Sequence, residues 1–172
     1  MPTCVNKKKA DSFIKQIDKL PFMKDPSKPS YQKWFDIKDT VLLKSFVQGC
    51  KQYLNYLPNE YKISSWVHVT NNKCVKKTDV YHVHNPNRAY ALSGILYLNI
   101  PEKSSHTKFI CDNKEFLLPK EPYCWFIFPS NLPHIPGVNN NTQKRYCLSA
   151  DFWLSAKTKI SSEFPIFELL VI

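Results

Sequence analysis

Glycine is scarce in this chain of 172 residues, which has 3 glycines against 13 prolines. A phosphate-binding loop needs several glycines within a few positions, so a Gly-rich nucleotide loop is not expected. No apolar run approaches the ~18 residues of a membrane-spanning helix. Three lysines at 7–9 are not followed by an apolar stretch, so the sequence predicts neither a secretory signal nor a membrane association.

Closely spaced cysteine pairs are also missing. The six cysteines, at positions 4, 50, 74, 111, 124 and 147, stand too far apart in sequence to form a zinc-binding pair. The chain is long enough to build a core without a disulfide framework. We therefore predict reduced, mostly buried cysteines in a cytoplasmic protein.

The composition is that of a folded protein, with 43% hydrophobic and 14% aromatic residues and a net charge of +10. A basic surface suits nucleic acid, an acidic partner or an anionic small molecule, or it only keeps the protein in solution. The lysines are scattered, which favours the last interpretation. There is no internal repeat, so we predict a single domain over 1–172.

The pattern along the chain predicts a mainly β fold with flanking helices. A basic N-terminal arm, 1–30, holds a short helix near 11–20, and the segment 31–58 holds a buttressing helix over 36–57, which Asp39 could cap. Asn71-Asn72 is expected to form a hairpin turn. Together these predict a double-stranded β-helix, a jelly-roll or cupin-like barrel, over 62–154. The apolar tail, 155–172, could dock on the body or form a homodimer. The predicted strands are 62–70, 75–84, 92–100, 107–111, 123–128 and 144–154.

Two histidines spaced by two residues suggest a metal site. On a strand, His82 and His84 place both imidazoles on one face. His134 follows 50 residues later, after an apolar strand, and is the natural third ligand. Iron(II), zinc and manganese all accept imidazole nitrogen. His68 and His106 are interpreted as ordinary structural histidines, although His68 lies on a strand that could line the barrel.

The strand that begins at Arg145 carries a polar face. Arg145, Cys147, Ser149 and Asp151 alternate with apolar residues, so they share one side. A guanidinium and a hydroxyl on the metal-ligand face would form a fork for a carboxylate. The alternative is an arginine that is solvent-exposed or paired with Asp151.

Four segments follow one another along the chain: His-Val-His-Asn-Pro-Asn at 82–87, Ser-Gly-Ile-Leu-Tyr-Leu-Asn at 93–99, Phe-Pro-Ser-Asn-Leu-Pro-His at 128–134, and Arg-Tyr at 145–146. These motifs in this order resemble the 2-oxoglutarate/iron(II)-dependent oxygenases, most closely the prolyl-hydroxylase-like branch and a group of small bacterial and phage members. The resemblance implies a hydroxylase (dioxygenase) that binds iron(II) and uses 2-oxoglutarate as cosubstrate. It implies that His82 and His134 bind the metal, that Arg145 binds the distal carboxylate of 2-oxoglutarate, and that Ser149 and Tyr97 help to hold it.

His84 departs from the family, which usually has an aspartate at this position. Either the site is an all-histidine triad, or His84 is not a ligand and activity is reduced. Trp66, Tyr81 and Trp125 are candidates for the substrate pocket. Because Trp125 and Phe126 are adjacent on a strand, only one of them can face inward.

Two other classes of function stay open at this stage. One is a cupin-like metal protein or three-histidine oxygenase that does not use 2-oxoglutarate. The other is a non-enzymatic β-sandwich binding module with incidental histidines. A nucleic-acid dealkylase is disfavoured, because such enzymes usually carry a second arginine at the position of Asp151. The substrate, a small molecule or a protein side chain, is not identified by the sequence.

Overall fold

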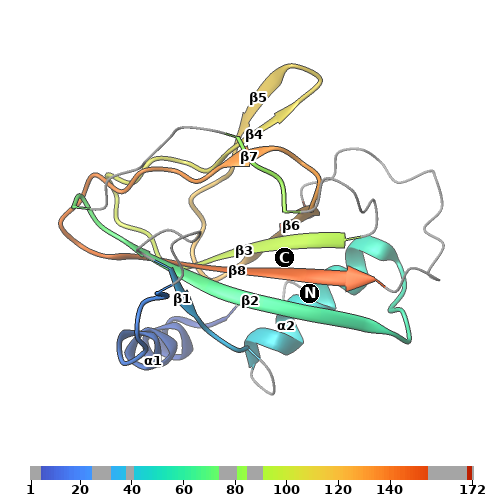
Figure 1. Cartoon of the computed structure of the whole chain (residues 1–172), viewed down its shortest axis with the longest axis horizontal. Helices are drawn as coiled ribbons and strands as arrows, with labels where there is room; N and C mark the ends of the chain where they lie inside the picture. The colour runs from blue at the N-terminus through green and yellow to red at the C-terminus, as the bar shows by residue number, and fades with distance from the viewer. Residues whose placement is uncertain are drawn as a thin grey trace.

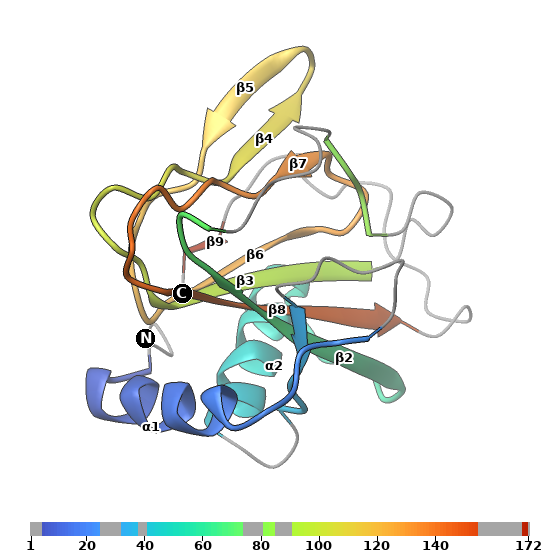
Figure 2. The same ribbon diagram turned by 60° about the vertical axis from the view of Figure 1, so that its left-hand side comes forward.

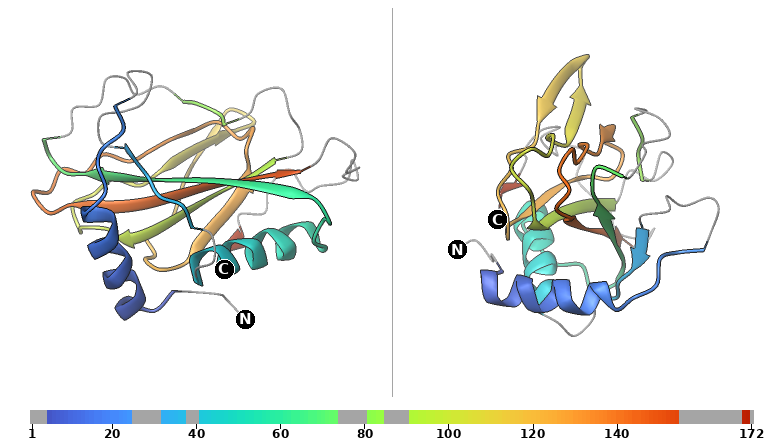
Figure 3. Two further views of the ribbon diagram at one scale, coloured as in Figure 1. Left: turned by 60° about the horizontal axis from the view of Figure 1, so that its bottom comes forward. Right: turned by 90° about the vertical axis from the view of Figure 1, so that its left-hand side faces the viewer.

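The computed structural model describes residues 5–24, 32–37, 41–73, 81–84, 91–154 and 170–171 (Figure 1). Two helices, α1 (Lys7–Asp18) and α2 (Val41–Leu54), lie on one side of a six-stranded antiparallel sheet, and a three-stranded antiparallel sheet lies on the other side (Figures 1 and 3). The large sheet has the order β1 (Gln32–Trp34), β2 (Tyr61–Thr70), β8 (Arg145–Leu154), β3 (Ala91–Asn99), β6 (Trp125–Pro129), β9 (Leu170–Val171). The small sheet has the order β5 (Lys114–Leu117), β4 (Lys108–Cys111), β7 (His134–Ile135).

Both helices form where apolar residues recur at helical spacing. The side chain of Asn6 caps α1 by accepting the Lys9 backbone N–H at 2.9 Å, so the helix begins before the predicted 11–20. Helix α2 is shorter than the predicted 36–57. At its C-terminal end it is followed by Asn55, which lies in the left-handed region with φ 61°. Ile37 lies before the helix, and its N–H donates to the Ser65 hydroxyl. The predicted cap, Asp39, lies outside the described residues.

Strict alternation gives the large sheet two different faces. On β8, the apolar residues Tyr146, Leu148, Ala150 and Phe152 pack with both helices in one core. Gly94 of β3 lies under α2, where a Cβ atom would stand 2.6 Å from Phe46 Cε2. This close approach lets the helix lie directly on the sheet.

The opposite face of the large sheet looks toward the small sheet across a second apolar cluster, which includes Ile95, Tyr97, Phe109, Phe126 and Phe128. Figure 2 shows β4, β5 and β7 standing over β3, β6 and β8. Two facing antiparallel sheets with helices behind the larger one are the arrangement that the sequence predicted.

The predicted strands agree with the structure except at short elements. Strands β1, β5, β7 and β9, each of two to four residues, were not predicted, although β4, with four residues, was. Most of the predicted strand 75–84 lies outside the described residues, and at 81–84 the structure has one isolated bridge, between His82 and His134. Asn71 forms a turn, accepting the Lys73 N–H at 3.0 Å, but the strand expected after it is not described.

Two predictions about the rest of the chain can be compared with the structure. Residues 170–171 pair with β6, so this part of the tail docks on the body. The prediction that all six cysteines are reduced is wrong for Cys124, which is disulfide-bonded, whereas Cys50, Cys111 and Cys147 are free. The cysteine argument for a cytoplasmic location therefore no longer holds. Neither described helix is long and apolar enough to cross a membrane.

Candidate metal centre and anion pocket

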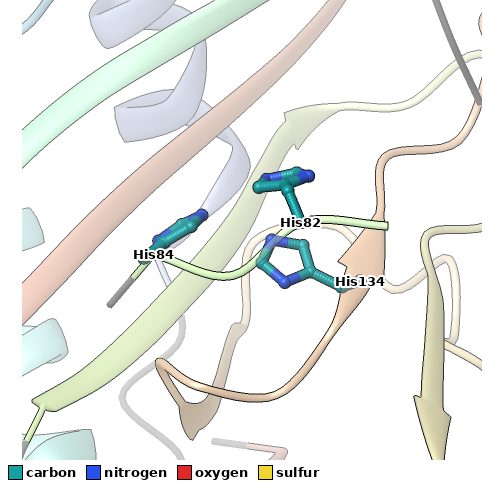
Figure 4. A group of neighbouring side chains, drawn as sticks. All are labelled: His82, His84 and His134. Carbon is teal, nitrogen blue, oxygen red and sulfur yellow. The ribbon is translucent and has the colours of Figure 1, made fainter. Parts of the chain in front are cut away.

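Three imidazoles converge between the two sheets (Figure 4). The ring centroids of His82 and His134 are 4.3 Å apart, and those of His84 and His134 are 4.8 Å apart. One nitrogen from each ring lies within 4.8 Å of the others, so a single cation could contact all three. His134 is buried and His82 is exposed, which leaves the cluster open on one side. The predicted ligands, His82, His84 and His134, are therefore brought together.

Backbone hydrogen bonds bring these distant segments together. His82 and His134 exchange reciprocal N–H···O bonds of 3.0 Å, and the His84 N–H donates to the Ser130 carbonyl at 2.9 Å. The turn after β6 is closed by the Leu132 N–H, which donates to the Pro129 carbonyl. A turn that begins at the last residue of β6 therefore returns His134 beside the segment 81–84.

Two of the three imidazoles have their Nδ1 atoms held by acceptors. Nδ1 of His134 lies 3.0 Å from the Leu132 carbonyl, and Nδ1 of His84 lies 2.7 Å from Asp151 Oδ1. A carbonyl oxygen and a carboxylate can only accept, so in the neutral rings Nδ1 carries the hydrogen and Nε2 keeps its lone pair. This is the tautomer in which an imidazole ligates through Nε2.

Burial also keeps imidazoles neutral here. Burial, together with the neighbouring His84 and His82, lowers the pKa of His134 to about 3. Burial and His84 lower the pKa of His82 to about 4, and the opposing effect of Asp151 is smaller. Since a metal binds the neutral ring, His82 and His134 can accept a cation at neutral pH without first losing protons.

Arg145 forms a second polar feature on the same face of the large sheet. Its side chain is buried, with 3% of its surface exposed. Within the described part of the chain, its Nε and Nη1 have no hydrogen-bond partner. The predicted alternatives, solvent exposure or pairing with Asp151, do not apply, because Asp151 pairs with His84. A buried guanidinium with free donors is suited to an anion from outside the protein.

The groups around Arg145 come from three adjacent strands. Its charge lowers the pKa values of Tyr97, Cys147 and His68, although burial has the largest effect on each. Burial raises the pKa of Cys147 to about 11 and lowers that of His68 to about 3. His68 is also affected by His82 and His84, so its ring lies near the imidazole cluster as well as near the guanidinium.

The predicted cosubstrate residues lie on this face. Ser149 is buried and directly opposite Ile95 in the β3–β8 ladder. Tyr97 is buried, and its hydroxyl is 2.6 Å from the Thr107 hydroxyl. Trp66, directly opposite Ser149 on β2, has its ring centroid 5.3 Å from that of His84. Its buried Nε1 has no hydrogen-bond partner among the described residues.

Two of the predicted pocket residues are placed elsewhere. Trp125 faces the helices: its Nε1 donates to Ser45 of α2 at 3.0 Å, and its ring packs on Phe46. Phe126, not Trp125, faces the small sheet. The Tyr81 hydroxyl donates to Glu115 of β5 at 2.7 Å. Glu115 also pairs with Lys108, so these side chains lie on the face of the small sheet opposite to that of the interior-facing Phe109. Trp125 therefore faces away from the imidazoles, and the hydroxyl of Tyr81 is held by Glu115.

Three residues at the site were not predicted to have a role there. His68 and Asp151 were assigned to strands that could line the barrel, and period-two alternation already placed Asp151 on the face of Arg145. Ser93 of β3 donates to Asp151 Oδ1 at 2.7 Å. Only the register between β3 and β8, in which Ser93 lies opposite Asp151, reveals this contact.

No family model and no curated protein matches this sequence. Solved structures resemble it closely in fold. EvdO2 from Micromonospora carbonacea var. aurantiaca, complexed with 2-oxoglutarate, has a TM-score of 0.64 at 12% identity, with 96% of this chain and 88% of that chain covered. HygX from Streptomyces hygroscopicus, with nickel, 2-oxoglutarate and hygromycin B bound, has a TM-score of 0.61 at 10% identity, with 92% and 83% covered.

A Pseudomonas putida prolyl-4-hydroxylase has a TM-score of 0.55 at 12% identity, with 91% of each chain covered. The match to EvdMO1 covers 90% of this chain but only 46% of that longer chain. These neighbours have a jelly-roll fold, so the predicted fold class is confirmed. At such identities the comparison shows the fold alone, and this chain shares its jelly-roll fold with EvdO2, HygX and the prolyl-4-hydroxylase.

Proposed function

We propose that this protein is a 2-oxoglutarate- and iron(II)-dependent oxygenase that hydroxylates a small molecule or a protein side chain. The observation that carries the proposal is a pair of features in the space between the two sheets. Three imidazoles converge within the reach of a single cation, and the face of the large sheet that looks toward them carries a buried guanidinium with free donors. The same fold in EvdO2 and HygX binds 2-oxoglutarate, which supports this assignment.

In this proposal, His82, His84 and His134 hold the cation. Three protein ligands on one side of a metal leave positions open for cosubstrate and oxygen, and imidazole suits iron(II). When bound, iron(II) would supply the oxidising chemistry: dioxygen would give one oxygen atom to succinate, formed from 2-oxoglutarate with release of carbon dioxide, and the other to a C–H bond of the substrate. The chain holds His84 and His134 in the required tautomer and excludes water around His134.

Arg145 would hold the distal carboxylate of 2-oxoglutarate. Two parallel N–H donors match the two oxygens of a carboxylate, and burial strengthens the pairing. The hydroxyls of Ser149 and Tyr97 lie on the same face and would add polar contacts. Trp66 lies beside His84, where the exposed His82 opens the cluster, and would contact the substrate as it enters.

The test begins with metal binding. Purified protein should bind iron(II) or manganese(II), and His134→Ala and His82→Ala should each abolish the binding. His106→Ala is the matched control, because this imidazole lies outside the cluster, with its Nδ1 2.7 Å from the Leu118 carbonyl. Wild-type metal affinity in His134→Ala would contradict the proposed centre.

Cosubstrate use needs a separate assay. Iron-loaded protein should convert 2-oxoglutarate to succinate, even slowly without the substrate, and Arg145→Met should prevent this while it spares metal binding. Metal binding without succinate formation would favour the alternative, a cupin-like or three-histidine oxygenase that uses another reaction.

A further inference from the structure

Asp151 carries the one carboxyl group that is buried among the described residues, with 3% of its surface exposed. It lies on β8, on the face of the large sheet that looks toward the imidazoles. Its Oδ1 is 2.7 Å from His84 Nδ1. The side chain of His84 is only 11% exposed, and that of Asp151 only 5%. A carboxylate this well buried needs hydrogen bonds, and it receives them at the metal centre.

Ser93 supports this contact from β3. Its side chain is fully buried, and its hydroxyl donates to Asp151 Oδ1 at 2.7 Å. The Ser93 oxygen lies 3.1 Å from His84 Nδ1. Since Ser93 and Asp151 are direct partners in the ladder between β3 and β8, the sheet itself fixes the position of the carboxylate. Asp151 therefore meets His84 from a rigid part of the fold.

The contact decides which nitrogen of His84 is available. Both donors end on the same carboxylate oxygen, which can only accept, so the hydrogen of neutral His84 lies on Nδ1. Nε2 then keeps its lone pair for the cation. The Leu132 carbonyl orients His134 in the same way. His84 and His134, which belong to different elements, thus both have Nδ1 held by an acceptor and Nε2 left for the cation. An incidental surface ion pair would not explain the same arrangement at two residues.

The contact also affects the charge of the centre. Three neutral imidazoles leave the charge of a dication uncompensated, and Arg145 adds a further positive charge to the same face. The family resemblance places a carboxylate at the position of His84, where it would contact the metal directly. In this chain the negatively charged group is Asp151, which contacts the imidazole of His84 instead of the cation itself.

We propose that Asp151 is a positioning residue of the metal centre: it holds His84 with Nε2 toward the cation, and it supplies the negative charge that His84 lacks. This inference rests on the proposed metal centre. It also explains how a histidine can occupy the usual aspartate position without loss of metal binding.

The first measurement uses the metal-free protein. Long-range ¹H–¹⁵N spectra of the imidazoles should show His84 with its hydrogen on Nδ1 in the wild type. Asp151→Asn keeps an acceptor oxygen and should keep this tautomer, whereas Asp151→Leu removes the acceptor and should lose the preference. Wild-type protein with the hydrogen on His84 Nε2 would overturn the proposal. Thermal unfolding confirms that each variant is folded.

The second measurement is cobalt(II) affinity, followed through the visible absorption of the bound ion. Loss of a hydrogen-bonding partner behind a metal ligand typically weakens binding 10- to 100-fold, which we expect for Asp151→Leu. Asp151→Asn should fall between Asp151→Leu and the wild type, because it keeps the orientation but loses the charge. Asp18→Asn removes a carboxylate on the helix side of the sheet and should bind cobalt(II) like the wild type.

A double-mutant cycle separates positioning from a general structural effect. In a His84→Ala background, Asp151→Asn should cause no further loss of cobalt(II) affinity, because Asp151 acts through His84. An equal loss in both backgrounds, or Asp151 variants within twofold of the wild type, would overturn the proposal while the metal centre stands. Wild-type protein that binds no cobalt(II) and no iron(II) would instead overturn the proposed function, and this inference with it.

Discussion

Arg145→Met should leave the ligand-free protein as stable as the wild type, or make it more stable, while it removes the response to 2-oxoglutarate. Methionine keeps the apolar stem of the side chain and removes the guanidinium. In the wild type, Nε and Nη1 are buried without partners among the described residues. Each buried donor left unpaired costs about 1–3 kcal/mol, so their removal offsets the packing lost with the head group. The expected change in unfolding free energy is between zero and a gain of about 3 kcal/mol.

The ligand response gives the second half of this prediction. With manganese(II) present, 2-oxoglutarate at 100 times its dissociation constant should stabilise the wild type by about 2.7 kcal/mol. For a chain of this length each kcal/mol shifts the melting temperature by about 2–4 °C, so the shift should be about 5–10 °C. Arg145→Met should show almost none of it.

The neighbouring residue supplies the control. Lys144 is exposed and pairs with Asp18 on the helix side of the sheet at 2.9 Å. Lys144→Met should cost about 0.2–1 kcal/mol, as exposed ion pairs do, and should keep the full shift with 2-oxoglutarate. Arg145→Met protein that is destabilised by more than about 2 kcal/mol, yet still responds to 2-oxoglutarate, would show that the guanidinium has a structural role and is not the anion site.

Two further predictions concern the helix side of the sheet. Gly94→Ala should destabilise the protein by about 1–3 kcal/mol in urea unfolding, because the new Cβ would lie 2.6 Å from Phe46; Phe46→Leu in the same chain should recover part of the loss, and additive losses would contradict this packing argument. Burial raises the pKa of Asp18, but hydrogen bonds from Lys144 and Tyr146 outweigh it and leave the pKa below its ordinary value. The stability that a lowered carboxyl pKa contributes is present above the unfolded pKa and is lost as the pH falls through the folded pKa. Asp18→Asn should therefore lower the free energy of unfolding by about 0.5–1 kcal/mol at pH 7 and by almost nothing near pH 2. An equal cost at both pH values would show that its charge is unimportant.

The larger strands could be predicted from the sequence because their alternation spans eight to ten residues. On β8, period two assigned Arg145 and Asp151 to one face and Leu148 to the other, and the structure agrees. The same rule could not decide between Trp125 and Phe126, since adjacent residues always point apart. The register settles it: Trp125 lies opposite Leu96, which packs in the helix-side core.

The convergence of the histidines could be predicted only as a spacing of residue types. His134 meets His82 through a strand of two residues and an isolated bridge, and such short elements carry no period that a sequence shows. What the sequence did contain was the apolar strand before His134. This strand indicated a return of the chain without fixing where it arrives.

The polar face of β8 shows why its two charges have different partners. Arg145 and Asp151 are six residues apart on one extended strand, a separation of about 20 Å between Cα atoms, so they cannot pair with each other. Asp151 is satisfied within the protein by His84 and Ser93. Arg145 lies at the other end, and no described side chain supplies the acceptors for its Nε and Nη1. A strand that satisfies its acidic end internally and leaves its basic end open is arranged to receive an anion from solution, and this asymmetry is the physical basis for proposing a carboxylate cosubstrate.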